Sequence, residues 1–233
     1  MIFGNIIAET VWERARLGRF TASGIHRLLT PPKSKEAKES GQLSETAKGY
    51  LFEKASEILT GTTRQIQTFS TDWGNTYEPE AVALLAPQFI ALEYYGNENK
   101  RFFSYSKFAG GSPDAISGKN VVFEIKCPEN PANHVEYFLL TEKTFSDYRD
   151  FYAQLQMNML SVAVCYKQPF LSMRGFFVSY YPMILDTIPA HCKLKVLEIR
   201  PNKDFKEKLD IVLPKAEKLL SEMMLEIITP PQK

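Results

Sequence analysis

The segment that most constrains the fold is the stretch GGSPDAISGKNVVFEIKCP near the middle of the chain. The turn sequences SPD and SGKN flank short apolar runs, which predicts a β-hairpin whose second strand covers residues 121–126. Side chains alternate between the two faces of a strand, so Val122, Glu124 and Lys126 share one face. Asp114 lies across the hairpin from that face. The sequence therefore predicts two carboxylates and one ammonium held together by a rigid apolar strand.

A cluster of this kind suits a divalent metal ion. Carboxylates are hard oxygen ligands that favour Mg²⁺ or Mn²⁺, and a metal held by two of them keeps positions for water and a phosphate oxygen. The lysine could activate that water or neutralise charge on the phosphate. A Glu-x-Lys triplet alone is usually a surface salt bridge, but the SPD turn and the Cys-Pro that ends the strand add specificity. The pattern resembles the PD-(D/E)xK nuclease core, with Asp114, Glu124 and Lys126 at the matching positions.

Three further sequence blocks surround this core. RLGRFTAS (16–23) and WGNTYE (73–78) lie upstream of it, and YAQLQ (152–156) lies downstream. In this order and at these distances, the four blocks resemble the phage λ exonuclease and viral recombinase (alkaline exonuclease) family over residues 12 to 160. The resemblance implies a restriction-endonuclease-like α/β fold, in which helices flank a central mixed β-sheet.

Length and composition agree with one domain. The chain has 233 residues, of which 44% are hydrophobic, and this is enough to bury a sizeable core. We expect a single nuclease domain over residues 1–233. Its motif-bearing core would cover about residues 12–165, and its C-terminal strands and helix would cover residues 166–233.

The resemblance also implies roles for the site residues. The metal ligands would be Asp114, Glu124, Glu78 and the backbone carbonyl of Ile125, holding two Mg²⁺ ions, with Mn²⁺ as a possible substitute. Lys126 would activate water or stabilise charge, and Gln154 would position the water through its neutral amide. Glu80 competes with Glu78 for the role of third carboxylate. Pro79 disfavours a helical conformation at the residue before it, which complicates the placement of Glu78.

A second group of residues is suited to phosphate. In the family, residues at the positions of Arg16, Ser23 and Ser112 hold the terminal 5′-phosphate, since arginine and hydroxyl donors bind phosphate oxygens. Arg16 in a surface salt bridge and Ser23 as a helix cap are the competing interpretations. Further DNA contacts are expected from Arg19, Lys33 and Lys35. The loop that carries the two lysines, PPKSKEAKESG, is also typical of a solvated connector.

Charge and cysteine content exclude some protein classes and leave others open. With 28 basic and 27 acidic residues the formal net charge is +1, so positive charge for DNA would have to be local. The cysteines are Cys127, Cys165 and Cys192, too few for a four-cysteine iron–sulfur site. No apolar run reaches the roughly 18 residues of a membrane span, and we see no signal peptide. We expect a cytoplasmic phage or prophage protein in a bacterial host.

Local signals place several helices. Thr21 or Ser23 could cap one helix, and Ser44 could cap another that ends before Gly61. A third is expected from Asp72 or Thr76 to about Leu85, and Ser146 is expected to open a long helix that carries Gln154. The last helix, near the C-terminus, contains Pro214 as a predicted kink.

We therefore expect a Mg²⁺-dependent 5′→3′ exonuclease that digests double-stranded DNA ends and leaves 3′ single-stranded tails. The resemblance implies a ring-shaped homotrimer around DNA that acts beside a single-strand annealing protein in recombination. Two alternatives remain open at this point. One is a site-specific or structure-specific PD-(D/E)xK endonuclease, and the other is a non-catalytic DNA-binding protein with this fold.

Overall fold

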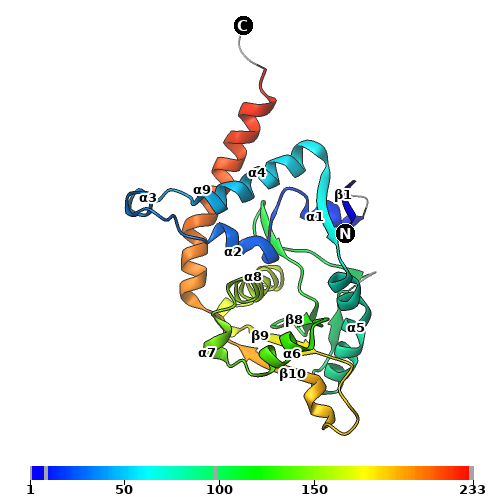
Figure 1. The fold of residues 1–233 in the computed structure, drawn as a ribbon. Coiled ribbons are helices and arrows are strands. Elements are labelled where there is room, and N and C mark those ends of the chain that lie inside the picture. Colours follow the sequence, from blue (N-terminus) through cyan, green and yellow to red (C-terminus); the bar gives the residue numbers. More distant parts are fainter. Residues whose placement is uncertain (1, 8–9, 97–98, 231–233) are drawn as a thin grey trace.

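The computed structural model describes residues 2–7, 10–96 and 99–230, and it is built around a five-stranded sheet (Figure 1). The strands lie in the order β10–β9–β8–β7–β4. Their bounds are β4 (Leu92–Tyr94), β7 (Ala115–Ser117), β8 (Val121–Lys126), β9 (Arg174–Tyr180) and β10 (Leu194–Ile199). Strands β8 and β9 run parallel, whereas the other neighbouring pairs in this sheet are antiparallel. The predicted mixed sheet, with β7 and β8 as its hairpin, is confirmed.

Strand β8 is buried on both faces, and alternation along it sets which side chains share a face, as predicted. Its odd-numbered residues pack in one apolar cluster with helix α5 (Phe69–Leu85). Val122 lies on the other face, in a second cluster with helix α8 (Arg149–Tyr166). Glu124 and Lys126 share the face of Val122. Because close packing fixes the strand from both sides, the core itself sets the direction of these two charged side chains.

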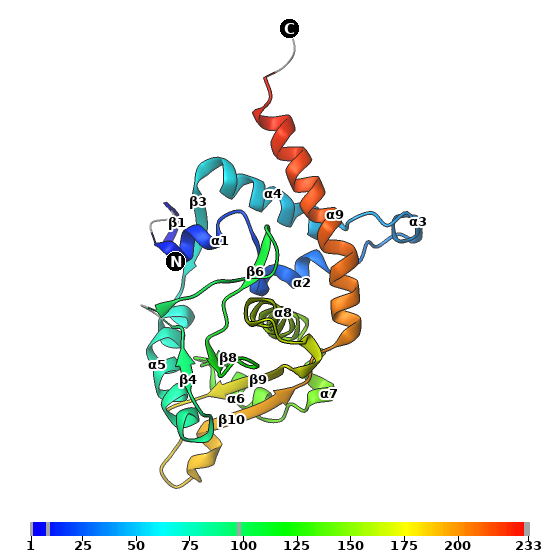
Figure 2. The same ribbon diagram turned by 180° about the vertical axis from the view of Figure 1, so that it is seen from behind.

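Helix α8 lies between the sheet and a layer of other helices (Figures 1 and 2). The helices of that layer are α2 (Ile25–Leu28), α4 (Glu45–Thr60) and α9 (Lys203–Ile228). Met157 and Leu160 of α8 pack into the apolar cluster of this layer, while Leu155 packs towards the sheet. A helix that is buried nearly all round is expected to be apolar nearly all round. Polar residues within α8 therefore require a specific explanation.

Two shorter helices and several short strands complete the described fold. Helices α6 (Pro131–Phe138) and α7 (Glu142–Phe145) pack against the sheet on the side of α8. The remaining elements are α1 (Val11–Arg16), α3 (Lys35–Glu39), β1 (Ile2–Ile7), β2 (Phe20–Thr21), β3 (Thr62–Gln67), β5 (Phe103–Ser104) and β6 (Ala109–Gly111). Strand β1 pairs with β3, and β6 pairs with both β2 and β5. The β2–β6 pairing matters for function, because it brings the chain that follows α1 beside the chain that leads into Asp114.

The helix that begins at Ser44 agrees with the sequence prediction. Ser44 accepts a hydrogen bond from the backbone N–H of Ala47, and Gly61, with a φ of 67°, ends α4. Prolines occur inside two helices, Pro79 in α5 and Pro214 in α9. A proline removes one backbone hydrogen bond, but burial of the flanking apolar residues keeps both helices continuous. None of the described helices is both long and apolar enough to cross a membrane.

Three predicted helix starts are wrong. Ser146 ends α7 instead of opening α8, which begins at Arg149. Helix α5 begins earlier than predicted, because Thr68 caps it by accepting the backbone N–H of Thr71. After Thr21 the chain makes a 3-10 turn before the short α2, and no side chain caps either piece. The Thr68 cap is a local signal that the prediction missed, whereas no side-chain cap marks the start of α8 or the turn after Thr21.

Candidate active site

Glu124 lies at the centre of the site and is completely buried. Its Oε1 atom accepts hydrogen bonds from Lys126 Nζ and from Gln154 Nε2, each at 2.6 Å. Its Oε2 atom accepts a hydrogen bond from Asn158 Nδ2 at 3.0 Å. A buried carboxylate is costly unless hydrogen bonds and an opposite charge offset the loss of water. Strand β8 and helix α8 together supply that compensation.

Asp114 lies in the connection between β6 and β7 and is tied to β8 through its backbone and its side chain. Its backbone N–H donates to Phe123 O, and its Oδ2 accepts the backbone N–H of Ile125 at 2.6 Å. Burial raises the pKa of Asp114 well above its usual value, and the nearby charges of Glu124 and Glu78 raise it further. This carboxyl group therefore lies where negative charge is already crowded.

Lys126 remains a cation in this site. Burial disfavours its charged form, but the carboxylates of Glu124 and Asp114 outweigh that effect and raise the pKa of the ammonium. Its Nζ also lies 5.2 Å from the centre of the Phe151 ring. An ammonium with a raised pKa is a poor base but a good source of positive charge. Of the two chemical roles predicted for Lys126, the raised pKa of its ammonium favours stabilisation of charge.

Helix α5 brings Glu78 to the same cluster. Burial raises the pKa of Glu78, and the charge of Glu124 adds to that effect, whereas a hydrogen bond with Tyr94 and the charge of Lys126 lower it. Glu80, the competing carboxylate, instead accepts a hydrogen bond from the Tyr180 hydroxyl at 2.8 Å. Pro79 between them does not displace Glu78, because α5 continues through it.

A cavity of about 270 Å³ joins the acidic residues to the residues predicted to bind phosphate. Glu78, Asp114 and Gln154 lie along its wall together with Arg16, Ser23 and Ser112. The wall also includes Trp12, Thr21, Ala22, Asn75, Tyr95, Gly96, Lys100 and Pro113. One cavity at the β7–β8 hairpin therefore brings together residues from the other three sequence blocks, RLGRFTAS, WGNTYE and YAQLQ. This arrangement would allow a phosphate group to reach the carboxylate cluster and the basic residues at the same time.

Arg16 lies on the wall of this cavity. Its guanidinium carbon lies 4.2 Å from the centre of the Trp12 ring, and Trp12 Nε1 donates to Ser112 Oγ at 3.0 Å. Burial lowers the pKa of Arg16, although the nearby Tyr50, Glu57 and Glu13 oppose the shift. Packing on an aromatic ring orients a guanidinium without using its hydrogen-bond donors. Those donors can therefore still serve a ligand.

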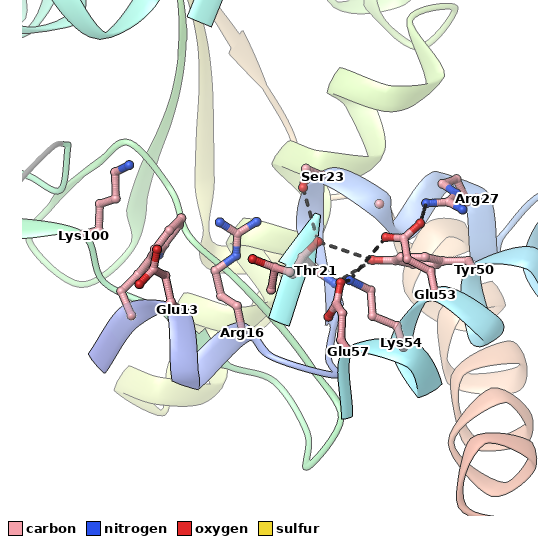
Figure 3. A pocket seen from close by; sticks show the side chains of 13 residues that line it. Glu13, Arg16, Thr21, Ser23, Arg27, Tyr50, Glu53, Lys54, Glu57 and Lys100 are labelled. Atoms are coloured by element: carbon pink, nitrogen blue, oxygen red, sulfur yellow. Dashed lines mark hydrogen bonds and ion pairs between the residues drawn. The ribbon is translucent and has the colours of Figure 1, made fainter. Parts of the chain in front are cut away.

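A second cavity, of about 370 Å³, shares Trp12, Arg16, Thr21, Ser23 and Lys100 with the first (Figure 3). It extends towards α4, whose side chains make two ion pairs along its wall. Lys54 pairs with Glu57 at 2.6 Å, and Arg27 pairs with Glu53 at 2.7 Å. Figure 3 shows these pairs beside Arg16, which points towards the space between them and Lys100.

Helix α4 also holds the backbone that follows Arg16. The carboxylate of Glu57 accepts the backbone N–H of Gly18 at 2.9 Å, and the Tyr50 hydroxyl accepts the backbone N–H of Thr21 at 3.0 Å. The Thr21 hydroxyl in turn contacts the Ser23 hydroxyl at 3.2 Å. Gly18 has a φ of 68°, a conformation that a residue with a side chain rarely adopts. The segment from Arg16 to Ser23 is therefore positioned by α4.

The sequence matches one protein-family model over most of its length. Residues 11–163 match the YqaJ-like viral recombinase domain. The chain belongs to the YqaJ-like viral recombinase family. All four sequence blocks, including the catalytic hairpin, lie within the matched range. A comparison with curated protein sequences finds no match.

Solved structures of two exonucleases share the fold. LHK-Exo, an alkaline exonuclease from Laribacter hongkongensis, has 21% identity and a TM-score of 0.63, and the alignment covers 93% of this chain and 96% of that one. A phage-related exonuclease from Haemophilus somnus 129PT has 19% identity and a TM-score of 0.67, with 90% of this chain and 96% of that one covered. LHK-Exo has also been solved in complex with dAMP. At these identities the likeness establishes the fold, and it confirms the predicted α/β nuclease architecture.

Three of the residues predicted to contact DNA line neither of the two cavities. Arg19 donates to Ser104 Oγ at 2.9 Å and does not line either cavity. Lys33 and Lys35 are away from both cavities, and Lys35 makes an exposed pair with Glu39 at 3.8 Å. The loop that carries them forms the short helix α3, at the edge of the molecule (Figure 1).

Several site residues of this viral recombinase domain were not predicted. Trp12 lies one helical turn before Arg16, and Asn158 lies one turn after Gln154, so both share a helix face with a predicted residue. Helical spacing could therefore have suggested them. Lys100 and Tyr94 carry no such signal, because they reach the site from strands and loops that pack beside it only in the folded chain.

The donor set of the recombinase site fits a hard divalent cation. Among the residues that the structure describes, no group of three or more aspartate, glutamate, histidine or cysteine side chains is placed so that it could hold a metal ion as it stands. Glu124 is instead turned to Lys126, Gln154 and Asn158. The carboxylates of Asp114, Glu124 and Glu78 nevertheless repel one another electrostatically, and burial disfavours the charge on Asp114 and Glu78. A cation with oxygen ligands would relieve both effects.

Proposed function

We propose that this chain is a Mg²⁺-dependent 5′→3′ exonuclease that digests one strand from the ends of double-stranded DNA. The observation that carries the proposal is the single cavity that joins Glu78, Asp114 and Gln154 to Arg16, Ser23 and Ser112. Membership of a viral recombinase family supports the same conclusion, because recombination by strand annealing needs 3′ single-stranded tails.

The acidic part of the cavity would carry the chemistry. Asp114, Glu124 and Glu78 would hold the metal, together with the backbone carbonyl of Ile125. Mg²⁺, or Mn²⁺ in its place, would supply a Lewis acid that polarises the phosphate and lowers the pKa of a bound water, and two ions per site are expected. Lys126 would stabilise the charge that develops on the phosphate.

Gln154 has a neutral amide at the wall of the cavity, where it could orient the attacking water. Its Nε2 donates to Glu124, which leaves its carbonyl oxygen to accept a hydrogen bond from that water. A neutral group would keep this role at every pH in the working range.

The basic part of the cavity would decide which strand is digested. Arg16, Ser23 and Ser112 would bind the terminal 5′-phosphate, while Glu57 and Tyr50 of α4 hold the segment that carries the first two. Arg19, Lys33 and Lys35 lie farther out and would meet only the duplex beyond the end. We further propose a homotrimer, a single-strand annealing protein as partner, and a phage or prophage origin with action in the host cytoplasm.

One experiment tests the activity and its alternatives together. The protein is incubated with Mg²⁺ and either linear duplex DNA labelled on one 5′ or 3′ end, or covalently closed circular DNA. We expect loss of the 5′-ended strand from the linear substrate, survival of the circle, and no cleavage in EDTA. Cleavage of the circle would identify an endonuclease, and binding without cleavage would identify a non-catalytic DNA-binding protein. Light scattering then tests assembly, with three times 26.6 kDa expected.

Helix α5 offers a matched pair of variants for the third carboxylate. Glu78→Gln should strongly reduce cleavage, because it removes charge from the cavity wall. Glu80→Gln makes the same change two residues away, where the carboxylate bonds Tyr180, and should leave cleavage near the parent rate. Equal rates in the two variants would remove Glu78 from the proposed metal site.

A further inference from the structure

Asn158 is an unexpected residue for its position in the fold. It lies in α8, completely buried, between Met157 and Met159, which are also completely buried. Asparagine is a weak helix former, and a buried amide costs free energy unless it is hydrogen-bonded. An apolar residue would pack at this position without either cost. We therefore look for a contact of this side chain that an apolar residue could not make.

That contact is the hydrogen bond from Asn158 Nδ2 to Glu124 Oε2 at 3.0 Å. The other end of the amide, Oδ1, is buried without a hydrogen-bond partner among the described residues, and it lies against Gly111. A Cβ atom at Gly111 would overlap with Oδ1, so this glycine leaves the space that the amide occupies. Turning the amide over would place its oxygen against the Glu124 carboxylate. The carboxylate therefore fixes the orientation of the amide, and the amide in turn restrains the carboxylate.

Asn158 differs from the other two donors to Glu124 in its freedom to move. Lys126 and Gln154 both bond Oε1, and both are partly exposed at the site. Each of them also has a role in the proposed mechanism, Lys126 at the phosphate and Gln154 at the water. Asn158 has no access to the cavity and has no alternative partner. Asn158 is therefore the donor that can remain hydrogen-bonded to Glu124 during the whole reaction.

We propose that Asn158 is a positioning residue, which holds the Glu124 carboxylate in the orientation that a divalent cation requires. The inference rests on the proposed metal-dependent function and adds a residue to its site. When Lys126 turns to the phosphate, the bond from Asn158 to Oε2 keeps the Glu124 carboxylate from rotating. Loss of a hydrogen bond to a metal ligand typically costs about 10–100-fold in metal affinity.

The direct test measures Mg²⁺ binding to the full chain by isothermal titration calorimetry, without DNA. Asn158→Leu keeps a similar volume and removes the donor, so we expect Mg²⁺ affinity to fall about 10–100-fold. The melting temperature in EDTA should also fall, because Glu124 Oε2 is left buried without its donor, so the Mg²⁺ affinity is the deciding measurement. A purely structural role for Asn158 predicts a lower melting temperature with unchanged Mg²⁺ affinity.

Ser161 provides a matched control on the same helix. It is equally buried, and its hydroxyl donates to the backbone carbonyl of Met157, away from the carboxylates. Ser161→Ala should leave Mg²⁺ affinity unchanged. Asn158→Ser is a milder second change, which leaves a hydroxyl and room for water, and it should weaken Mg²⁺ binding less than Asn158→Leu does.

The outcomes separate this inference from the function on which it rests. If the parent protein does not bind Mg²⁺, the metal-dependent function is wrong, and the role of Asn158 falls with it. If the parent binds Mg²⁺ and the folded Asn158 variants bind it equally well, only the inference about Asn158 is overturned. Should Asn158→Leu fail to fold, the comparison of Asn158→Ser with Ser161→Ala decides in the same way.

Discussion

The acidic and basic parts of the active-site cavity are built in different ways. The acidic part comes from the central sheet and the two helices that cover it, and Glu124 is completely buried there. The basic part comes from α1, the short β2 and the turn that follows, with Ser23 exposed at its surface. Carboxylates that repel one another stay together only where packing holds them. A phosphate pocket needs only positive charge and donors that a surface element can offer.

The two parts also differ in how their charges are balanced. Lys126 is paired directly with Glu124, so the acidic part contains its own counter-charge. Arg16 instead packs on Trp12, while the nearby Lys54 and Glu57 pair with each other. In the proposed function the acidic part carries the chemistry, and the basic part keeps donors available for binding. Substitutions in the acidic part should abolish cleavage, and substitutions in the basic part should alter which DNA ends are digested.

The largest effect is expected from the metal ligands. Asp114→Asn or Glu124→Gln should abolish cleavage, because each removes ligand charge with little change of shape. DNA binding should be retained or even tightened, since repulsion of phosphate is relieved. The measurement combines a cleavage assay with a DNA-binding titration in Ca²⁺. Near-normal Mg²⁺-dependent cleavage in either variant would show that the acidic part of the cavity is not the catalytic part.

Lys126 should have the next largest effect. Lys126→Ala should reduce kcat by about 10²–10³-fold, as expected for loss of one electrostatic catalytic group. Lys126→Arg should recover little of that loss, because a planar guanidinium does not replace a compact ammonium bonded to Glu124. Single-turnover kinetics at saturating DNA would measure both. Full activity of the arginine variant would mean that Lys126 is only a surface charge.

Arg16 tests the basic part of the cavity alone. Arg16→Ala should lower the preference for a 5′-phosphate over a 5′-hydroxyl by about tenfold or more, since one charge-assisted hydrogen bond contributes about 1.5–3 kcal/mol. The rate on the 5′-hydroxyl substrate should change little, because Arg16 does not contact Glu124. Two duplexes that differ only in the 5′ group provide the measurement. A parent enzyme that digests both equally would refute end recognition without touching the nuclease assignment.

The smallest effect concerns the stability of the metal-free protein. The folded state raises the pKa of Asp114 above its unfolded value, so the folded state binds this proton more tightly. The associated stability is present at pH values below the usual aspartate pKa, and it is lost as pH rises through the raised value. Asp114→Asn should therefore be more stable than the parent at neutral pH in EDTA, and the difference should shrink as pH falls. Urea unfolding across this range would check it, and a difference independent of pH would contradict it.

The sequence predicts the acidic part of the site better than the basic part. The hairpin of β7 and β8 carries Asp114, Glu124 and Lys126 within one short segment, where alternation along a strand gives their relative directions. Gln154 and Glu78 come from distant segments, and the structure places both at the same cavity. Their placement was carried only by the family resemblance, since no local rule states which helix face will meet the sheet.

The basic part shows what local reasoning cannot supply. Arg19, Lys33 and Lys35 match the composition of a DNA contact, yet they lie outside both cavities. Lys54 lies in an amphipathic helix with no functional signal, yet it lines the second cavity. The basic part is built from short elements, α1, β2 and the turn that follows, which have few local sequence signals of their own. Their packing against α4 and α8 therefore decides where their side chains point. Local signals are equally weak at the start of α8, where no side chain caps the helix and the start predicted at Ser146 is wrong.

The buried pair of Lys54 and Glu57 has a consequence for protein engineering. Buried ion pairs can often be replaced by apolar residues with no loss of stability, so a redesign that optimises only the melting temperature would select such a replacement. Here Glu57 also accepts the backbone N–H of Gly18, two residues after Arg16. A chain redesigned in this way would keep its melting temperature but lose the hydrogen bond that restrains the turn at Gly18. If the basic part binds the 5′-phosphate as proposed, screening for thermal stability alone would therefore enrich variants that no longer distinguish one DNA end from another.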